Sequence, residues 1–357
     1  MGWLPVLVLS GLVLAACHRG PESGKPESET NVEAKEQPSF IAPDKQAKPC
    51  GQEESRASVP GEPVTVEAVE AAVRSGNPQA LAHLLASGLD RPTLDAALSV
   101  AVREDRASAV GTLLEHGADP NLRSGGAPLL AWALAGRSVP IVTALVRAGA
   151  EVNTALPAPA PEALITAVGD ESFAYYLRRE RNVTLLMLAA ATGQVEAVRT
   201  LIEAGAARNA KTAKHQTTAI WLAGKRQHVE IVQLLLGKDP SPAAQVRRIE
   251  ISLSRQRATL WENGEPLLGS PISSGKKGFA TPKGRFVVTN KYRDWKSTLY
   301  EDAPMPYFMR LSCLDFGLHA GKIPGYPASH GCVRLPQAQA KGFFEKTDIG
   351  TLVEIID

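Results

Sequence analysis

The run from His319 to Arg334 reads H-A-G-K-I-P-G-Y-P-A-S-H-G-C-V-R, which places two histidines and three glycines close to one cysteine, Cys332. A cysteine sulfur is a good nucleophile only as the thiolate, and a neighbouring imidazole can accept its proton. Glycine lets backbone amides approach a substrate closely. These residue types in this order therefore indicate covalent acyl transfer through Cys332.

Two simpler interpretations use the same residues. His319, His330 and Cys332 could bind zinc, but the run lacks the second cysteine pair or the H-E-x-x-H helix of common zinc sites. Cys332 could instead be a buried, inert thiol beside unrelated histidines. Residue order excludes a papain-like arrangement, because both histidines precede the cysteine.

Three further runs accompany this one in the same part of the chain: T-P-K-G-R-F (281–286), P-M-P-Y-F-M-R-L (304–311) and G-T-L-V-E-I-I (350–356). Together they make the tail from about Val246 to Asp357 resemble the catalytic domain of bacterial L,D-transpeptidases. The resemblance implies a small, mostly antiparallel β fold. Its cysteine would attack the amide after the diaminopimelate residue of a peptidoglycan stem peptide, and the acyl group would then pass to an amine. Only nine residues separate His319 from Ser329, fewer than is usual in the family, which leaves the acceptor open.

The identity of the base is the main choice within this site. The resemblance implies that Cys332 is the nucleophile and His319 the general base, oriented by a backbone carbonyl near Ala320. Spacing alone favours His330, because residues two apart in an extended segment project to the same side. Gly331 lies between them, and a turn there would aim the two side chains differently. We expect an imidazolium beside Cys332 to lower the pKa of its thiol below the free value of about 8.5.

The remaining site residues follow from the same motifs. His330 and Ser329 match the family motif and are expected to shape the site, and the backbone amides near Gly331 and Cys332 are candidate oxyanion donors. Arg334 matches a basic position of the motif, where it would either contact substrate or form a structural salt bridge. Tyr307 lines up with a substrate-side strand in the family. No metal or cofactor is implied.

Strand and helix signals in this tail follow simple periodicities. Alternating apolar residues predict strands on both sides of Asn263-Gly264, a sequence typical of a tight hairpin turn. We expect strands at 247–254, 285–290, 307–311, 317–319 and 351–356, and one helix at 336–347.

An internal repeat precedes the tail. The runs G-A-D-P-N (117–121), G-A-E-V-N (149–153), G-A-A-R-N (205–209) and L-G-K-D-P (236–240) each follow an apolar helical pattern, and 84–90 is a weaker first copy. The first two of these glycines lie 32 residues apart, as do the last two, close to the ankyrin period of about 33. The run N-V-T-L-L-M-L-A-A (182–190) resembles ankyrin best.

The repeat departs from the ankyrin consensus in two ways. Its usual T-P-L-H histidine is absent, and Leu130, Met187 and Trp221 stand in its place, where we expect them to fill the same space. Insertions at 155–162 and 177–181 should emerge as loops or extra helices on one face. A generic array of helix pairs is the alternative to an ankyrin stack. The run D-P-S-P (239–242) marks the end of the repeat region.

The first residues suggest export. Met1 to Ala16 are mostly apolar, and L-A-A-C resembles a lipoprotein processing box, which implies cleavage before Cys17 and lipid on its sulfur. No Lys or Arg precedes the apolar run, so a cytosolic chain with an apolar start is the alternative. His18 after the cysteine favours the outer membrane by resemblance to sorted lipoproteins. We therefore expect a protein anchored through Cys17 on the periplasmic side.

Residues 17–63 are rich in Pro, Glu, Ser, Lys and Gln and contain too little apolar surface to fold, which predicts a disordered tether. The formal net charge of +2 argues against a nucleic-acid partner. If Cys17 carries lipid and the catalytic thiol stays reduced, Cys50 and Cys313 are the two cysteines that remain for a disulfide. Whether they form one stays open.

The sequence thus predicts a multidomain chain: a signal peptide at 1–16, a tether at 17–63, an all-α ankyrin-repeat solenoid at 64–242 and a mostly β L,D-transpeptidase catalytic domain at 243–357. The expected function is peptidoglycan transpeptidation on stem peptides, with a protein partner bound by the repeats. One alternative is an L,D-carboxypeptidase or endopeptidase that uses water. Another is a non-catalytic, wall-associated binding protein.

Overall fold

A computed structural model of the chain describes residues 64–299 and 302–357. The predicted signal peptide, the tether, Cys17 and Cys50 lie outside these described residues. Within them, no helix combines the length and the apolar character needed to cross a membrane. The described residues belong to one compact unit.

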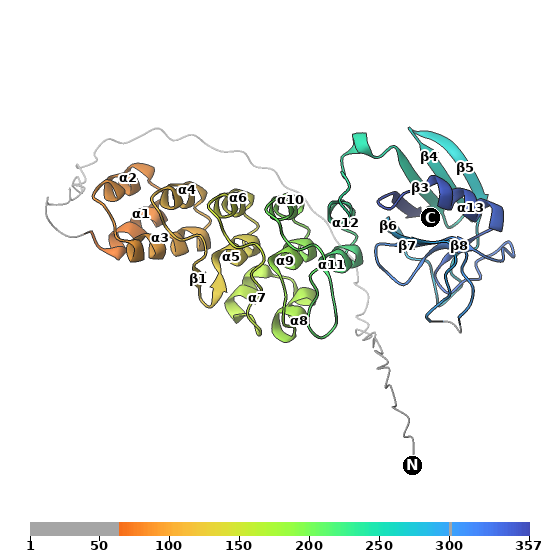
Figure 1. The fold of residues 1–357 in the computed structure, drawn as a ribbon, viewed down its shortest axis with the longest axis horizontal. Coiled ribbons are helices and arrows are strands. Elements are labelled where there is room, and N and C mark those ends of the chain that lie inside the picture. Colours follow the sequence, from red (N-terminus) through yellow and green to blue (C-terminus); the bar gives the residue numbers. More distant parts are fainter. Residues whose placement is uncertain (1–63, 300–301) are drawn as a thin grey trace, which may run out of the picture. The chain divides into compact units, whose positions relative to one another are not determined.

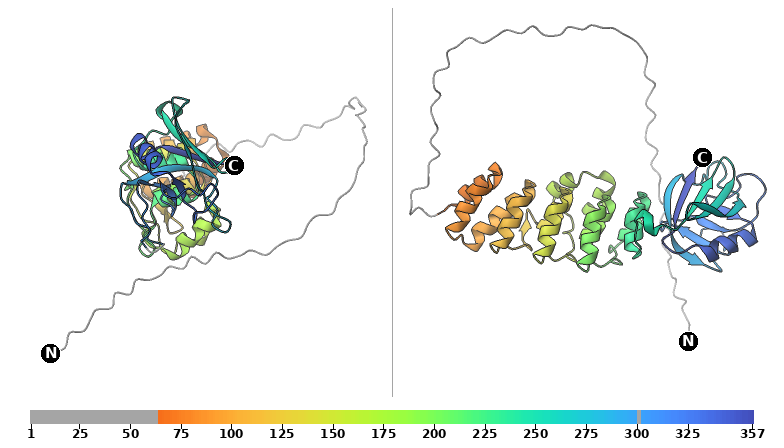
Figure 2. Two further views of the ribbon diagram at one scale, coloured as in Figure 1. Left: turned by 90° about the vertical axis from the view of Figure 1, so that its right-hand side faces the viewer. Right: turned by 90° about the horizontal axis from the view of Figure 1, so that it is seen from above.

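The first part of the described chain consists of short helices arranged as consecutive pairs (Figures 1 and 2). These are α1 (Val66–Ser75), α2 (Pro78–Ala86), α3 (Arg91–Arg103), α4 (Ala107–Glu115), α5 (Leu129–Ala135), α6 (Val139–Arg147), α7 (Glu162–Val168), α8 (Glu171–Arg179), α9 (Leu185–Ala191), α10 (Val195–Glu203), α11 (Ala219–Lys225) and α12 (Val229–Leu235). Helices α1, α3, α5, α9 and α11 contact one another in that order, and α2, α4, α6, α10 and α12 form a second row. Two short strands, β1 (Arg123–Ser124) and β2 (Ala127–Pro128), form a small hairpin before α5.

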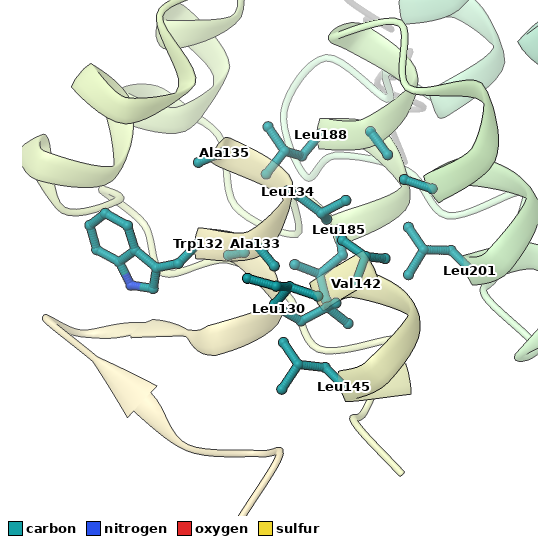
Figure 3. Packing of buried hydrophobic residues seen from close by; sticks show 14 of the residues in the cluster. Leu130, Trp132, Ala133, Leu134, Ala135, Val142, Leu145, Leu185, Leu188 and Leu201 are labelled. Atoms are coloured by element: carbon teal, nitrogen blue, oxygen red, sulfur yellow. The ribbon is translucent and has the colours of Figure 1, made fainter. Parts of the chain in front are cut away.

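Helices α5 and α9 are apolar all round, which suits them to packing against helices on several sides. Every residue of α5 and of α9 is buried, and Figure 3 shows their side chains between α6 and α10. Leu130 and Met187, which replace the consensus histidine, are 2 % and 0 % exposed, so both fill space in the core as expected. Thr184 begins α9 by accepting a hydrogen bond from the Met187 amide at 3.2 Å.

The recurring G-A-x-x-N run has a structural reason at each position. Its glycine ends a helix with a positive φ of 91°, 95° and 86° in the three copies. Its asparagine joins neighbouring copies: Asn121 Oδ1 accepts the Glu151 amide at 2.8 Å, and its Nδ2 donates to Gly149 at 3.3 Å. Asn153 makes the same two bonds to Ala207 and Gly205, at 2.8 and 3.1 Å. We call these four bonds the asparagine ladder.

The segment that holds the predicted insertions, 155–162 and 177–181, forms an extra helix pair, α7 and α8, which is one of the two forms expected. The bonds that Asn153 makes in the asparagine ladder connect the repeats before and after this pair, and α5 packs directly against α9. Asp170 caps α8 by accepting the Phe173 amide at 2.9 Å and forms an ion pair with Arg226 at 2.9 Å. The extra pair is therefore attached to the repeats without interrupting them.

The second part of the described chain is β-rich, as predicted. Its strands are β3 (Arg247–Ser252), β4 (Arg257–Glu262), β5 (Glu265–Pro271), β6 (Gly284–Tyr292), β7 (Phe308–Leu311), β8 (Gly317–Ala320), β9 (Val333–Leu335) and β10 (Leu352–Ile356). They form one eight-stranded sheet in the order β5-β4-β3-β10-β6-β7-β8-β9. Only the β3–β10 and β8–β9 pairs in this sheet are parallel, so the sheet is mostly antiparallel.

Local sequence explains several of these elements. Asn263 and Gly264 both have positive φ, 51° and 85°, which is the geometry of the predicted two-residue hairpin turn between β4 and β5. The helix expected at 336–347 is α13 (Gln337–Lys346). Ala340 and Phe343 on this helix are completely buried in the apolar core of the sheet, together with Leu318 and Val333.

The last helices also contact the sheet. Val287 of β6 and Leu352 of β10 are buried in the same apolar cluster as the helical repeats. The side-chain amide of Gln233 donates to the Gly350 carbonyl at 2.9 Å, and that of Gln227 donates to the Lys283 carbonyl at 3.2 Å. Removing the repeats would therefore expose apolar residues of the sheet, so experiments are best done on the full chain.

Candidate active site

Three neighbouring strands, β7, β8 and β9, position the candidate site residues. Strand pairing sets His319 of β8 opposite Arg334 of β9, and Arg310 of β7 opposite Gly317 of β8. Because Leu318 pairs with Val333 in a parallel register, Cys332 lies beside Gly317 at the start of β9. Paired residues in a sheet share a face, and so do residues two apart along a strand. Cys332 and His319 therefore project to the same side.

A tight turn leads the chain into Cys332. Gly331 has a φ of 115°, a conformation that residues with a Cβ rarely adopt. Its amide donates to Ser329 Oγ at 3.1 Å, and its carbonyl accepts from Thr281 Oγ1 at 2.9 Å. Ser329 is buried, and its hydroxyl donates to the Cys332 carbonyl. Ser329 thus holds the turn, and the Gly331 amide that we expected to be an oxyanion donor is already bonded to it.

A cavity of about 600 Å³ opens over this face of the sheet. Its described lining includes Cys332, His319, His330, Arg334, Ser329, Arg310, Trp295, Phe308, Asp315 and Lys322. Two of the sequence motifs, 304–311 and 319–334, therefore meet around one cavity. Among the described residues, no cluster of three or more histidine, cysteine, aspartate or glutamate side chains could hold a metal ion.

His319 is a buried, neutral imidazole. It is 6 % exposed, and its Nδ1 lies 2.8 Å from the carbonyl oxygen of Ala320. A carbonyl can only accept, so Nδ1 carries the proton in the neutral ring and Nε2 keeps a free electron pair. Burial lowers the pKa of His319 to about 4, and the charge of Arg334 acts in the same direction. The ring is thus able to accept a proton at neutral pH.

The pKa of Cys332 differs from our expectation. Burial raises the pKa of its thiol, although the Gly317 backbone and the charges of Arg334 and Arg310 act in the opposite direction. Our prediction of a lowered thiol pKa beside an imidazolium was therefore wrong. Burial disfavours both charged forms, so the resting pair is a neutral thiol and a neutral imidazole.

Two other predicted residues line the same cavity in different settings. His330 is exposed, and its ring meets that of Phe279 edge to face with centroids 4.6 Å apart. Arg334 lies in β9, where the stem of its side chain packs over Gly321. It makes no ion pair among residues 64–299 and 302–357, which argues against the structural salt bridge.

Tyr307 does not reach the cavity. It has a φ of 57°, and its ring packs against Phe344 of α13 with centroids 5.7 Å apart. It lies in a turn just before β7 and packs against the apolar core that contains Met309 and Leu311, which are both fully buried. The prediction that Tyr307 faces substrate is therefore corrected.

Sequence reasoning missed Arg310, Trp295 and Phe308. Arg310 follows Met309 in the P-M-P-Y-F-M-R-L run, and alternation along β7 places Phe308 and Arg310 on the cavity side. That alternation was readable in the sequence. Cys313 is a half-buried free thiol outside the cavity, and burial raises its pKa as well.

Family comparisons agree with both halves of the described chain. Residues 246–355 match the L,D-transpeptidase catalytic domain family, YkuD. Residues 163–245 match ankyrin repeats in three copies. The chain therefore contains an L,D-transpeptidase catalytic domain that follows ankyrin repeats.

Individual relatives are more distant. A curated Bacillus licheniformis protein that carries the name L,D-transpeptidase YkuD is 29 % identical over 112 residues, which cover 30 % of this chain and 64 % of the relative. An L,D-transpeptidase structure from Mycobacterium tuberculosis H37Rv is 21 % identical, with a TM-score of 0.30, over 31 % of this chain and 58 % of the other. One from Enterococcus faecium is 24 % identical, with a TM-score of 0.30, over 37 % and 64 %. This chain thus spans less than two thirds of each.

Proposed function

We propose that this protein is a peptidoglycan L,D-transpeptidase that transfers an acyl group through a thioester on Cys332. The observation that carries the proposal is the pairing of two groups in one cavity: the half-buried thiol of Cys332, and an imidazole whose Nδ1 is held by the Ala320 carbonyl. A backbone carbonyl in this position does the orienting work that an aspartate does in a serine protease triad. His319 is favoured over His330 as the base because His330 lies exposed against Phe279.

The reaction begins with two neutral groups. As the sulfur of Cys332 attacks the carbonyl carbon of the diaminopimelate residue, Nε2 of His319 takes the thiol proton. The tetrahedral intermediate collapses, the bond to D-alanine breaks, and the imidazolium returns the proton to the leaving amine. An acceptor amine then attacks the thioester, transfers a proton through His319, and restores the thiol. The Cys332 amide is the oxyanion donor we infer for both steps, because the Gly331 amide is bonded to Ser329.

Incubation of the full-length protein with a disaccharide tetrapeptide, followed by mass spectrometry, tests the function. We expect a cross-linked dimer with loss of D-alanine, and no product from Cys332→Ser. A tripeptide product instead would identify water as the acceptor and the protein as a carboxypeptidase. If the wild type forms neither product while its Cys332 remains open to alkylation, the transpeptidase proposal is wrong.

We also propose that Cys17 carries a lipid that anchors the protein to a membrane, with the outer membrane favoured. The support is the L-A-A-C sequence after a short apolar run. The change Cys17→Ser is expected to move the protein from the membrane fraction to the soluble fraction, or to block its processing. Unchanged incorporation of a labelled fatty acid into Cys17→Ser would contradict this assignment.

The ankyrin repeats, which we take to form one solenoid, are proposed to bind a protein. Repeats of this kind use a continuous surface for partners, and the candidate catalytic residues all lie in the sheet domain. Cross-linking of the full-length Cys332→Ser protein in a cell-envelope extract, with partners mapped by mass spectrometry, tests this. Cross-links that fall only on 246–355 would contradict it.

A further inference from the structure

Arg310 occupies a distinctive place beside the nucleophile. Arg310, Gly317 and Cys332 lie side by side on β7, β8 and the start of β9. Adjacent strands are about 4.8 Å apart, so Arg310 stands two strand spacings, roughly 10 Å, from Cys332. Between them Gly317 has no side chain, and a Cβ there would lie 2.1 Å from the Met309 carbonyl oxygen. The Phe308 ring would also lie 2.7 Å from such a Cβ, so the space over Gly317 is filled, and Arg310 and Cys332 face each other through the cavity that both line.

The guanidinium of Arg310 has no partner of opposite charge in the described chain. Its Nε is buried without a hydrogen bond, and it makes no ion pair among residues 64–299 and 302–357. It lies over the rings of Trp295 and Phe308, 5.7 and 5.8 Å from their centroids. Aromatic rings can hold the plane of a guanidinium without neutralising it. A buried donor left unsatisfied in this way is suited to a ligand that enters the cavity.

The charge of the cavity indicates what that ligand is. Arg310, Arg334 and Lys322 line it, and Asp315 is the acidic side chain in its described lining. Arg334 also lacks an ion pair within the described residues, and Asp315 is exposed. A planar guanidinium with several parallel donors matches a carboxylate. The cavity therefore favours a carboxylate close to the bond that reacts.

We propose that Arg310 is a specificity-determining residue that binds a free carboxylate of the donor stem peptide. The inference rests on the proposed function and names the feature of the substrate that this site recognises. A tetrapeptide donor has two such groups near the reacting carbonyl: the terminal carboxylate of D-alanine, and the carboxylate on the second centre of diaminopimelate. Both have the chemistry that Arg310 would recognise.

Binding to the full-length Cys332→Ser protein separates this inference from the transpeptidase activity. Calorimetry would compare three ligands: the tetrapeptide, its C-terminal amide, and the tetrapeptide with the diaminopimelate carboxylate amidated. We expect amidation of the recognised carboxylate to weaken binding roughly 10- to 100-fold, the range for hydrogen bonds to charged groups. In Arg310→Gln on the same background, the ligands should bind within about 3-fold of one another, because the discriminating donor is gone. The ligand that loses affinity identifies the carboxylate.

Two controls make the result specific to Arg310. Arg310→Lys should keep part of the preference, because it retains the charge but not the planar fork. Lys322→Gln, at an exposed cation in the same cavity, should keep the wild-type preference. The inference is overturned if all three ligands bind equally to the Cys332→Ser protein in which Arg310 is unchanged. It is also overturned if the preference is undiminished in Arg310→Gln. Failure of the transpeptidase proposal would appear separately, as absence of product from the wild type.

Discussion

Replacing His319 with glutamine is expected to slow acylation of Cys332 by imipenem roughly 100- to 10,000-fold, the usual contribution of a positioned general base. Imipenem is the acylating probe in this prediction. In the resting site neither group is charged, because burial raises the pKa of Cys332 and lowers that of His319. Attack therefore requires proton transfer at the moment of reaction, and the oriented ring of His319 is the group that we expect to accept the proton.

The pH profile of the same reaction provides an independent test. Because the pKa of His319 is lowered to about 4, the imidazole stays unprotonated far below the usual histidine pKa of about 6.5. The rate of acylation should therefore decline on the acid side with a midpoint near pH 4. A midpoint near 6.5 would contradict a buried, neutral base. Mass spectrometry of the acyl-enzyme at fixed times measures both effects.

Cys313→Ala serves as the matched thiol control, because Cys313 is a free cysteine outside the cavity. It should acylate at the wild-type rate, whereas Cys332→Ala should not acylate. If His330→Ala abolishes the reaction and His319→Gln does not, the two histidines have exchanged roles.

Gly317→Ala should destabilise the protein by roughly 1 to 3 kcal/mol, the usual cost of forcing extra atoms into a packed site. A Cβ at this position would lie 2.1 Å from the Met309 carbonyl oxygen and 2.7 Å from the ring of Phe308. Met309 is fully buried, so its backbone cannot retreat without disturbing β7. Since Gly317 also lies beside Cys332, acylation should slow as well. Chemical denaturation followed by circular dichroism measures the stability, and imipenem trapping measures the rate.

Gly269→Ala is the matched control in the same sheet. A Cβ there meets only the end of the Arg257 side chain, which can rotate away. Alanine loses less backbone freedom than glycine on folding, so this change should be neutral or stabilise the protein by up to about 1 kcal/mol. A Gly317→Ala protein as stable as Gly269→Ala would mean that β7 and β8 are not packed as described.

Local sequence signals predicted much of the fold because they depend on nearest neighbours. Asn263-Gly264 specified a turn with two positive φ angles, and alternation specified most of the strands. The glycine of the G-A-x-x-N run marked the helix ends in the same way. Strand β9, Val333–Leu335, was not predicted.

The errors at the site arose from properties that no local pattern contains. Burial of His319 and Cys332 depends on strands that are distant in sequence, so the direction of their pKa shifts could not be read from the motif. Tyr307 is a different case. Period-two alternation already grouped it with Met309 and Leu311, and left Arg310 on the other face, but family resemblance was given more weight.

The asparagine ladder has a consequence for how this chain can vary. Asn121 spans 28 and 30 residues to reach Gly149 and Glu151, whereas Asn153 spans 52 and 54 residues to reach the equivalent positions. The bonds are nearly identical in length although the intervening segment is almost twice as long. Correct spacing between repeats is thus enforced by side chains and does not depend on chain length. We therefore expect that the segment carrying α7 and α8 can be lengthened, shortened or replaced while the repeats keep their alignment.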